Sequence, residues 1–279
     1  MSPRDEPTSQ AAYATQAGRT YAAAADHYRR PALGFWDRWG SATVSRIDLS
    51  GGDRVLDVCC GAGASAIPAA LAVGATGSVL GLDLAEPLLA LARQRAADLG
   101  VGNVSFERHD ATETGLPSES FDAVVCVFGV FFAADMPAFV AEMWRLVRPG
   151  GTLAITTWGP GWCEPASDVF WSVVGRHDPT LVRAFNPWDD ITTPAALRDV
   201  FERGGVTDST FDATSGEVHH LEDPADFWDV VLGSGYRATI DALPGARRDL
   251  VRRDLITELR ERGINSIGND VVFGAAVKN

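Results

Sequence analysis

The chain has 279 residues, 46% of them hydrophobic, and a formal net charge of −13 at pH 7. This length suits one large α/β domain with or without an insertion, and the acidic balance argues against a nucleic-acid substrate. No apolar run reaches the roughly 20 residues of a membrane helix, and residues 1–10 lack the features of a secretory signal, so a cytoplasmic protein is expected.

Helices come first in the chain, and alternating strands and helices follow them. Apolar residues at helical spacing predict helices over 9–30 and 33–47. Buried strands are then predicted at 55–58, 77–84, 104–108, 121–127 and 152–157, with intervening helices that end near 73, 99 and 147. This alternation predicts a parallel, doubly wound sheet, because neighbouring parallel strands need a crossover connection.

The second half of the chain is less regular. Residues 158–205 are rich in Trp and Pro, and helices predicted near 167–175 and 194–203 indicate a cover over the site. A long strand over about 208–219, helices at 224–234 and 245–262, and a last strand at 270–278 follow. Because the chain ends on a strand, we expect this strand to insert into the existing sheet.

A glycine-rich turn follows the first buried strand, in the segment Val55–Ala66. Ligands of doubly wound sheets bind at the carboxyl edge of the strands, where this turn lies. Such a turn alone is weak evidence, since many nucleotide folds share it. Three further residues end the next strands in order: Asp83, whose carboxylate suits ribose hydroxyls, Asp110, whose carboxylate suits an adenine amino group, and Phe128.

A nicotinamide dehydrogenase is the competing interpretation of this segment. A dinucleotide places its pyrophosphate at the helix N-terminus, whereas the acidic Asp57 before the turn favours a cationic group. The spacing from Asp57 to Asp83 also exceeds the usual dinucleotide distance of about 20 residues. The pattern therefore favours a different nucleoside cofactor.

On these motifs the chain resembles a class I S-adenosylmethionine-dependent methyltransferase, closest to the ubiquinone and menaquinone C-methyltransferase group and related natural-product enzymes. The resemblance covers roughly residues 28–158. It implies S-adenosyl-L-methionine as cofactor, and it implies ten cofactor-binding residues: Tyr28, Asp57, Cys59, Gly61, Gly63, Asp83, Leu84, Asp110, Ala111 and Phe128. Cys59 departs from the family pattern, which usually has Gly or Ala there.

In the family, the acidic residue matched by Asp57 helps hold the methionyl amino group, and Asp83 matches the ribose-binding acid. Asp110 with Ala111 matches the adenine-side pair, and Tyr28 is the best match to a tyrosine that closes over the methionyl end, although helix packing also explains it. The turn at 148–151 is expected to be a structural stop before the fifth strand.

The fold expected from the sequence is α/β, a mostly parallel seven-stranded sheet of order 3-2-1-4-5-7-6 with the last strand antiparallel, N-terminal helices and a helical cover. Residues 1–48 are expected to form an N-terminal helical segment. Residues 49–279 are expected to form the methyltransferase domain, with cover insertions at about 159–205 and 221–264.

Methyl transfer is an in-line displacement from a sulfonium, so positioning supplies most of the rate, and a base helps where the acceptor loses a proton. His219 and His220, at the end of the predicted sixth strand, are the first candidates for this base. His177 and His27 are further candidates, and His109 is expected to face away from the cofactor. The alternative is that His219 and His220 are surface residues at the end of a strand, with no catalytic role.

The four cysteines form neither a disulfide framework nor a metal-binding pair, so reduced thiols and no metal are expected. Several aromatic residues gather in the predicted cover, where they either pack the core or line an apolar acceptor pocket. They are Phe131, Phe132, Trp158, Trp162, Trp171, Trp188 and Trp228.

The expected function is methyl transfer to an oxygen or carbon of a small, apolar or aromatic metabolite, in secondary metabolism or quinone biosynthesis, by a monomer or homodimer. Two alternatives stay open: a methyltransferase fold that binds the cofactor without transferring methyl, and a methyltransferase acting on protein or RNA.

Overall fold

The computed structural model describes residues 10–183 and 186–279, with side chains described from residue 15 onward. Its strands are β1 Arg54–Val58, β2 Ser78–Asp83, β3 Val104–Arg108, β4 Phe121–Val127, β5 Val147–Trp158, β6 Ser209–Ala213, β7 Val218–His220, β8 Ser266–Gly268 and β9 Val271–Val277. Its α-helices are α1 Gln10–Ala24, α2 Phe35–Val44, α3 Ala66–Val73, α4 Glu86–Asp98, α5 Met136–Leu146, α6 Ala166–His177, α7 Pro194–Arg203, α8 Phe227–Leu232, α9 Arg237–Asp241 and α10 Gly245–Glu261. Short 3-10 turns are η1 Pro31–Leu33, η2 Val130–Phe132, η3 Pro179–Leu181, η4 Asp189–Ile191 and η5 Pro224–Asp226.

Seven strands form one sheet in the order β3-β2-β1-β4-β5-β9-β6. The first five are parallel neighbours, and β9 runs antiparallel between β5 and β6. The predicted doubly wound sheet with an inserted last strand is therefore confirmed. The last strand is numbered β9 because β7 and β8 form a separate two-stranded hairpin.

Alternating side chains of the central strands bury both faces of the sheet. Val55, Val125 and their neighbours pack in one cluster with apolar residues of α3 and α4. Leu56 and Val124 belong to the other cluster, which contains the buried side chains of α5 and α7. Because both faces of these strands are buried, their sequences are continuous apolar runs and do not alternate between apolar and polar residues.

Two predictions for the second half of the chain need correction. The strand predicted over 208–219 is broken into β6 and β7, because the Asp270 carboxylate accepts hydrogen bonds from the backbone N–H groups of Gly216 and Glu217 at 3.0 Å each. These two N–H groups therefore cannot donate to a neighbouring strand. Gly216 also turns the chain, with a φ of +78°. Helix α7, expected in the cover, instead packs against α5, β6 and β9 on one face of the sheet.

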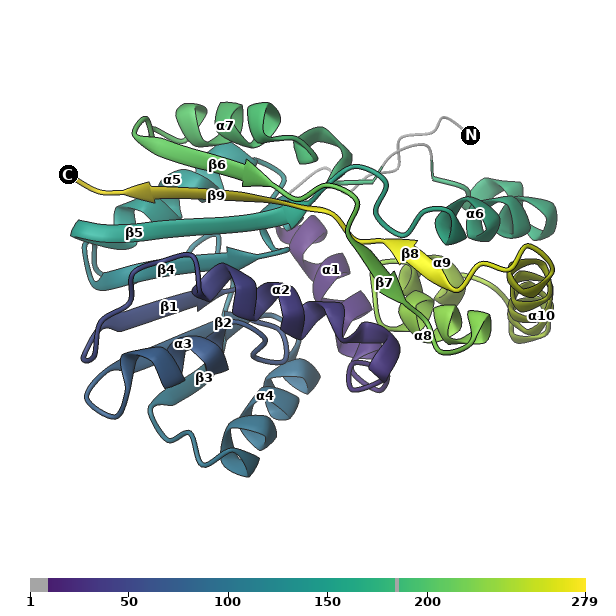
Figure 1. Cartoon of the computed structure of the whole chain (residues 1–279), viewed down its shortest axis with the longest axis horizontal. Helices are drawn as coiled ribbons and strands as arrows, with labels where there is room; N and C mark the ends of the chain where they lie inside the picture. Colours follow the sequence, from purple (N-terminus) through teal and green to yellow (C-terminus); the bar gives the residue numbers. More distant parts are fainter. Residues whose placement is uncertain (1–9, 184–185) are drawn as a thin grey trace.

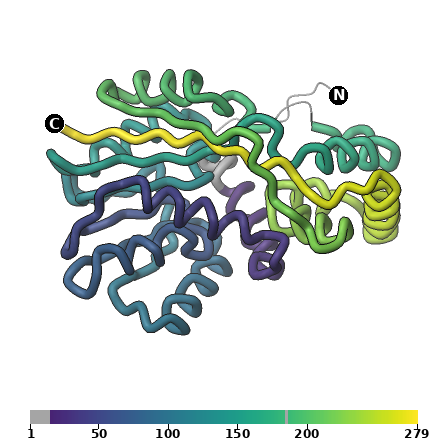
Figure 2. Tube along the Cα trace, in the orientation of Figure 1, coloured from purple at the N-terminus to yellow at the C-terminus, as the bar shows by residue number. Residues whose placement is uncertain are grey.

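A second lobe stands beyond the carboxyl edge of the sheet, on the right in Figure 1. This cap lobe consists of α6, α8, α9, α10 and the β7–β8 hairpin. Figure 2 shows the last part of the chain running from α10 through the hairpin and back across the molecule as β9, so the two parts share one continuous segment. Helix α1 contacts α4 on the sheet side and α9 in the cap lobe.

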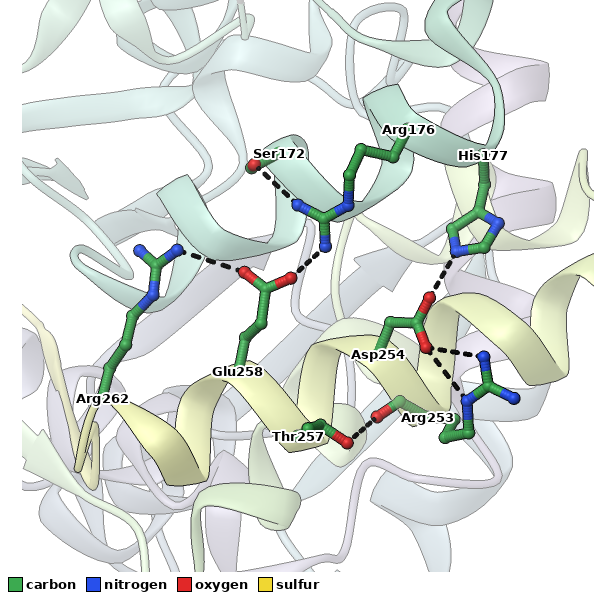
Figure 3. A network of polar contacts seen from close by, with 8 residues as sticks. All are labelled: Ser172, Arg176, His177, Arg253, Asp254, Thr257, Glu258 and Arg262. Atoms are coloured by element: carbon green, nitrogen blue, oxygen red, sulfur yellow. Dashed lines mark hydrogen bonds and ion pairs between the residues drawn. The ribbon is translucent and has the colours of Figure 1, made fainter.

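Polar contacts join α6 to α10 on the outer side of the cap lobe (Figure 3). Glu258 pairs with Arg176 and, at 3.1 Å, with Arg262. His177 Nε2 lies 2.8 Å from Asp254 Oδ2. Within residues 10–183 and 186–279, no helix has the length and apolar character needed to cross a membrane.

Candidate active site

A cavity lies at the carboxyl edge of the sheet, where β1, β2 and β4 end and residues of α1 cross above them. Its empty volume is about 920 Å³ with the open mouth included. Eight of the ten predicted cofactor-binding residues line it, namely Tyr28, Cys59, Gly61, Asp83, Leu84, Asp110, Ala111 and Phe128. Asp57 and Gly63 are not among the lining residues.

The turn between β1 and α3 forms the floor of the cavity through its backbone. Cys59, Gly61 and Gly63 have φ angles of 58°, 51° and 81°, in the left-handed region that favours glycine. Cys59 therefore carries a backbone strain of about 1 kcal/mol that glycine would avoid. A Cβ added to Gly129 would lie 2.5 Å from the Cβ of Cys59, so glycine at position 129 makes room for the cysteine side chain.

Asp83 ends β2 and holds the turn in place. Its Oδ2 accepts a hydrogen bond from the Gly61 N–H at 2.8 Å, and its Oδ1 accepts one from the Ala85 N–H at 2.8 Å. Burial raises the pKa of the Asp83 carboxyl, and these backbone donors partly offset that effect. A carboxylate has about four acceptor sites, so Asp83 retains capacity for hydroxyl groups of a ligand in the cavity.

Asp57 is fully buried beneath the turn rather than exposed in the cavity. Its Oδ2 accepts a hydrogen bond from Ser65 Oγ at 2.7 Å, while Oδ1 has no partner among the described residues. Burial raises the pKa of Asp57 to about 7, with a smaller contribution from the charge of Asp83. A cationic ligand in the cavity would favour the ionised form of both acids.

Asp110 and its neighbours form the side of the cavity beyond β3. Its Oδ1 accepts from the Thr112 backbone N–H at 3.0 Å and from Thr112 Oγ1 at 2.7 Å. His109 also lines the cavity, so the expectation that it faces away is wrong. The His109 Nδ1 donates to the backbone carbonyl of the next residue, Asp110, at 2.9 Å.

Aromatic rings also line the cavity or pack behind its lining. Tyr28 and Trp36 stack at a centroid separation of 5.6 Å and an interplanar angle of 4°. Phe128, at the end of β4, stacks on Trp158 at 3.6 Å and lies 5.5 Å from Trp36. The cavity lining thus combines acids with aromatic rings.

Tyr21 on α1 lines the cavity and was missed by the sequence analysis. Burial, then the nearby charges of Asp83 and Cys59, raise the pKa of its hydroxyl, which hydrogen-bonds with the backbone of Gly235 in the cap lobe. Tyr21 and Tyr28 are seven residues apart, a spacing that puts two side chains on the same side of a continuous helix. This spacing could have predicted that Tyr21 lies near Tyr28 in the site.

The two candidate catalytic histidines lie in β7, outside the lining of the cavity. His220 is exposed, whereas His219 is half-buried, with its ring 5.3 Å from Phe35 in an edge-to-face contact. The His219 ring hydrogen-bonds with the backbone of Ala32, and its buried Nε2 has no partner among the described residues. Burial lowers the pKa of the ring.

The other two candidate histidines each contact a carboxylate. His27 Nδ1 lies 2.9 Å from Asp229 Oδ1, which ties the segment after α1 to α8. His177 contacts Asp254 on the outer side of the cap lobe. Neither histidine lines the cavity.

Most of the predicted cover aromatics form a packed core. Trp162 stacks on Trp158 at 4.5 Å and on Tyr236 at 5.5 Å, and Trp188 meets Trp162 edge to face at 5.1 Å. Of the aromatic residues named for the cover, Phe132 is the one that lines the cavity. Core packing therefore explains most of the others.

The fold and the cavity together define a protein that binds a nucleoside-bearing ligand at the carboxyl edge of a doubly wound sheet. The glycine turn leaves space for close backbone approach, and the strand-end acids suit hydroxyl and amino groups. The buried, unpaired Oδ1 of Asp57 suits a ligand with positive charge. These properties fit S-adenosylmethionine, which is a sulfonium cation.

Comparisons with known proteins agree with this class. The methyltransferase domain family matches residues 55–151. Nocamycin O-methyltransferase of Saccharothrix syringae is 39% identical over 233 residues, covering 76% of this chain and 80% of the relative. Demethylmenaquinone methyltransferase of Oceanobacillus iheyensis is 37% identical over 113 residues, but the match spans 40% of this chain and about half, 48%, of that relative.

Among solved structures, phosphoethanolamine N-methyltransferase 2 of Haemonchus contortus, in complex with phosphomonomethylethanolamine and S-adenosylhomocysteine, matches with a TM-score of 0.58. The match is 20% identical, covers 98% of this chain and 61% of that chain, and supports the fold alone. The chain belongs to the class I S-adenosylmethionine-dependent methyltransferases, and S-adenosylmethionine is its cofactor.

Proposed function

We propose that this protein transfers the methyl group of S-adenosylmethionine to an oxygen or carbon of a small, apolar or aromatic metabolite. The observation that carries the proposal is the mixed lining of the cavity, which combines Asp83 and Asp110 with the aromatic rings of Tyr28, Trp36 and Phe132. Acids suit the cofactor, and rings suit an apolar acceptor. The nocamycin relative, an O-methyltransferase by name, supports a natural-product acceptor.

For the cofactor, we propose that Asp83 and Leu84 bind the ribose and that Asp110 with Ala111 binds the adenine. The backbone at Cys59, Gly61 and Gly63 approaches the methionyl end, as we expect from their left-handed conformations. Tyr28 and Phe128 cover the remaining sides of the bound cofactor. Asp57 acts from behind the lining through its negative charge.

When bound, the cofactor supplies an activated methyl carbon whose bond to sulfur breaks, with the electron pair going to sulfur, as the acceptor bonds to that carbon. The chain's own contribution is to hold the acceptor in line and to exclude water. Where the acceptor must lose a proton, we propose His219 as the base. Burial lowers the pKa of its ring, which favours the neutral imidazole, and its buried Nε2 has no hydrogen-bond partner among the described residues.

Phe35 lies between His219 and Trp36 of the cavity wall, since its ring is 5.3 Å from His219 and 4.8 Å from Trp36. The base role therefore requires an acceptor that extends past Phe35. His220 is exposed and is the weaker candidate.

Titration with S-adenosylmethionine and a panel of phenols, hydroxyquinones and enolisable diketones, with products identified by mass spectrometry, tests the proposal. We expect cofactor binding together with methylated product from at least one aromatic acceptor. His219→Gln should abolish turnover and leave cofactor binding intact, while His220→Gln, its matched control, should change neither. Cofactor binding without consumption across the panel would contradict methyl transfer and favour a binding module or another reaction.

We also propose a cytoplasmic location and a monomeric or homodimeric state. All four thiols are free, as suits a reducing compartment. Fractionation of the producing cells and light scattering of the purified protein test these two points.

A further inference from the structure

The β7–β8 hairpin lays one face against η1 and α2. Glu217, just before β7, pairs with Arg38 of α2, and His219 packs against Phe35 at the start of the same helix. The ladder continues past the end of β8, since the Asn269 N–H donates to the Glu217 carbonyl at 2.9 Å. The hairpin therefore extends by one more residue pair toward the sheet.

Strand alternation places His219 and Asn269 on the same face of this hairpin. His219 is directly opposite Ile267, and Asn269 is two residues beyond Ile267. Such diagonal neighbours have Cβ atoms roughly 7–8 Å apart, a distance that one small polar group can bridge. Both residues thus face the side on which Phe35 lies.

Asn269 is completely buried, and neither its Oδ1 nor its Nδ2 has a hydrogen-bond partner among the described residues. The Nε2 of His219 is in the same condition. A buried polar group without a partner is costly, so native proteins satisfy nearly all of them through protein, water or ligand. Three such atoms on one hairpin face indicate a partner that the polypeptide does not supply.

Two indole N–H groups in the same region are also buried and unpaired, those of Trp36 and Trp162. Their rings lie 5.5 Å and 4.5 Å from Trp158, and Phe35 lies 5.8 Å from it. Trp36 also lines the cofactor cavity. The unpaired groups of Trp36, Trp162 and His219 therefore border one aromatic cluster, which extends from the cavity wall to the hairpin.

The unpaired atoms include both donors and acceptors. Asn269 offers an amide N–H₂ and a carbonyl, and His219 offers the unpaired Nε2, which carries a lone pair when the ring proton is on Nδ1. An amide N–H₂ suits a carbonyl oxygen, and the imidazole lone pair suits a hydroxyl. A ligand with a hydroxyl next to a carbonyl would satisfy both side chains at once.

We propose that Asn269 and His219 form the polar anchor of the methyl acceptor and select an acceptor with a hydroxyl adjacent to a carbonyl on an aromatic or enolic frame. This inference rests on the proposed function and adds the acceptor's chemical class. Asn269 is then an acceptor-binding residue, and its carboxamide orients the hydroxyl toward Nε2 of His219.

The test uses the full-length protein saturated with S-adenosylhomocysteine, so that binding is measured without turnover. The probes are 1-hydroxy-2-acetonaphthone, which has the adjacent hydroxyl, and 2-acetonaphthone, which lacks it. We expect the hydroxylated probe to bind at least tenfold more tightly in calorimetric titration. Asn269→Leu should remove this preference while the affinity for S-adenosylhomocysteine stays unchanged.

Asn265→Leu, at an exposed asparagine just before β8, is the matched control and should retain the preference. His219→Leu should lose it, whereas His219→Gln, which keeps an acceptor atom, should retain most of it. The glutamine variant separates anchoring from proton removal, because only turnover depends on a titrating base.

Equal affinity of the wild-type protein for the two probes would overturn the inference. So would an Asn269→Leu variant that melts at a higher temperature and keeps the preference, since the carboxamide would then hold only a buried water. Failure of methyl transfer across the acceptor panel would contradict the proposed function but would leave the probe preference measurable, so the two failures are distinguishable.

Discussion

The acids that line the cofactor cavity and the polar groups on the inner face of the hairpin differ in their hydrogen bonding. On the cofactor side, both oxygens of Asp83 are paired with backbone N–H groups, and Asp110 is paired with Thr112. On the hairpin side, His219 Nε2 and the carboxamide of Asn269 are buried without partners. The chain itself holds the lining acids in place, whereas it supplies no partner for the buried hairpin groups.

This difference follows from how each region is built. The cofactor side uses strand ends and a glycine turn, whose backbone positions are fixed by the sheet. The hairpin side depends on side chains from η1, α2, β7 and β8, which are far apart in the sequence. We therefore expect changes on the cofactor side to act on cofactor affinity and changes on the hairpin side to act on acceptor selection.

The largest effect on cofactor affinity should come from Asp83→Ala, which tests whether the cofactor side is as organised as its contacts indicate. The change removes the acceptor for the Gly61 and Ala85 N–H groups and the acceptor proposed for the ribose. Charged hydrogen bonds contribute about 1.5–3 kcal/mol each, so the Kd for S-adenosylmethionine should rise about 100-fold or more by calorimetry. Asp98→Ala, at an exposed acid ending α4, should leave it unchanged.

The second prediction concerns Asp57, the buried acid of the cofactor side with an unpaired oxygen. Its folded-state pKa of about 7 lies above the ordinary value, so the folded protein retains a proton that the unfolded chain releases near pH 4. Stability should therefore fall as pH rises from about 4 to 7, by on the order of 4 kcal/mol, and then level off. Denaturant titrations between pH 4 and 7 check this. The free energy of unfolding of the wild type should fall with pH by this amount relative to that of Asp57→Asn, which has no carboxyl at this position.

The same acid links pH to cofactor binding. A cation in the cavity favours ionised Asp57, so affinity for S-adenosylmethionine should weaken as pH falls below about 7. S-adenosylhomocysteine lacks the sulfonium charge and should show a smaller dependence. Equal pH dependence for the two ligands would show that Asp57 does not sense the ligand charge.

The fold was largely predictable because its signals are local. Apolar runs gave the five parallel strands, and glycines and acids at their ends gave the cavity floor. The break between β6 and β7 was not predictable, since it depends on Asp270, which lies more than fifty residues further along the chain. The residues at 208–219 favour a strand by themselves and do not indicate that Asp270 will bind their backbone.

The candidate site divides in the same way. Asp83 and Asp110 were found because a strand end fixes where a carboxylate lies. Tyr21 was missed because its place depends on α1 reaching α9, and the unpaired state of Asn269 depends on the packing of three separate segments. Asp57 was recognised, but its burial beneath the turn required the structure.

The third prediction tests the packing that lets cysteine occupy a left-handed position. Gly129→Ala should destabilise the protein by about 1–3 kcal/mol, because the added Cβ meets Cys59 Cβ at 2.5 Å and Cys126 Sγ at 2.8 Å. The backbone itself does not forbid alanine, since φ of Gly129 is −113. Cys59→Gly should stabilise by about 1 kcal/mol through relief of strain.

The double variant should lose less stability than the two single effects predict, since one of the two clashes is gone. Denaturant unfolding of all four proteins measures this coupling. Strict additivity would show that the two positions do not compete for space.

The smallest effect should come from the outer side of the cap lobe, where Glu258 joins α6 to α10. Exposed ion pairs contribute about 0.2–1 kcal/mol each, and side chains in this network remain in contact with solvent. Glu258→Gln should therefore lower stability by about 1 kcal/mol at most and leave the Kd for S-adenosylmethionine unchanged. Glu261→Gln, at an exposed acid of the same helix, is the control. A tenfold loss of cofactor affinity in the Glu258 variant would mean that the cap lobe and the cofactor side act as one unit, because Tyr21 already joins α1 to the backbone of Gly235.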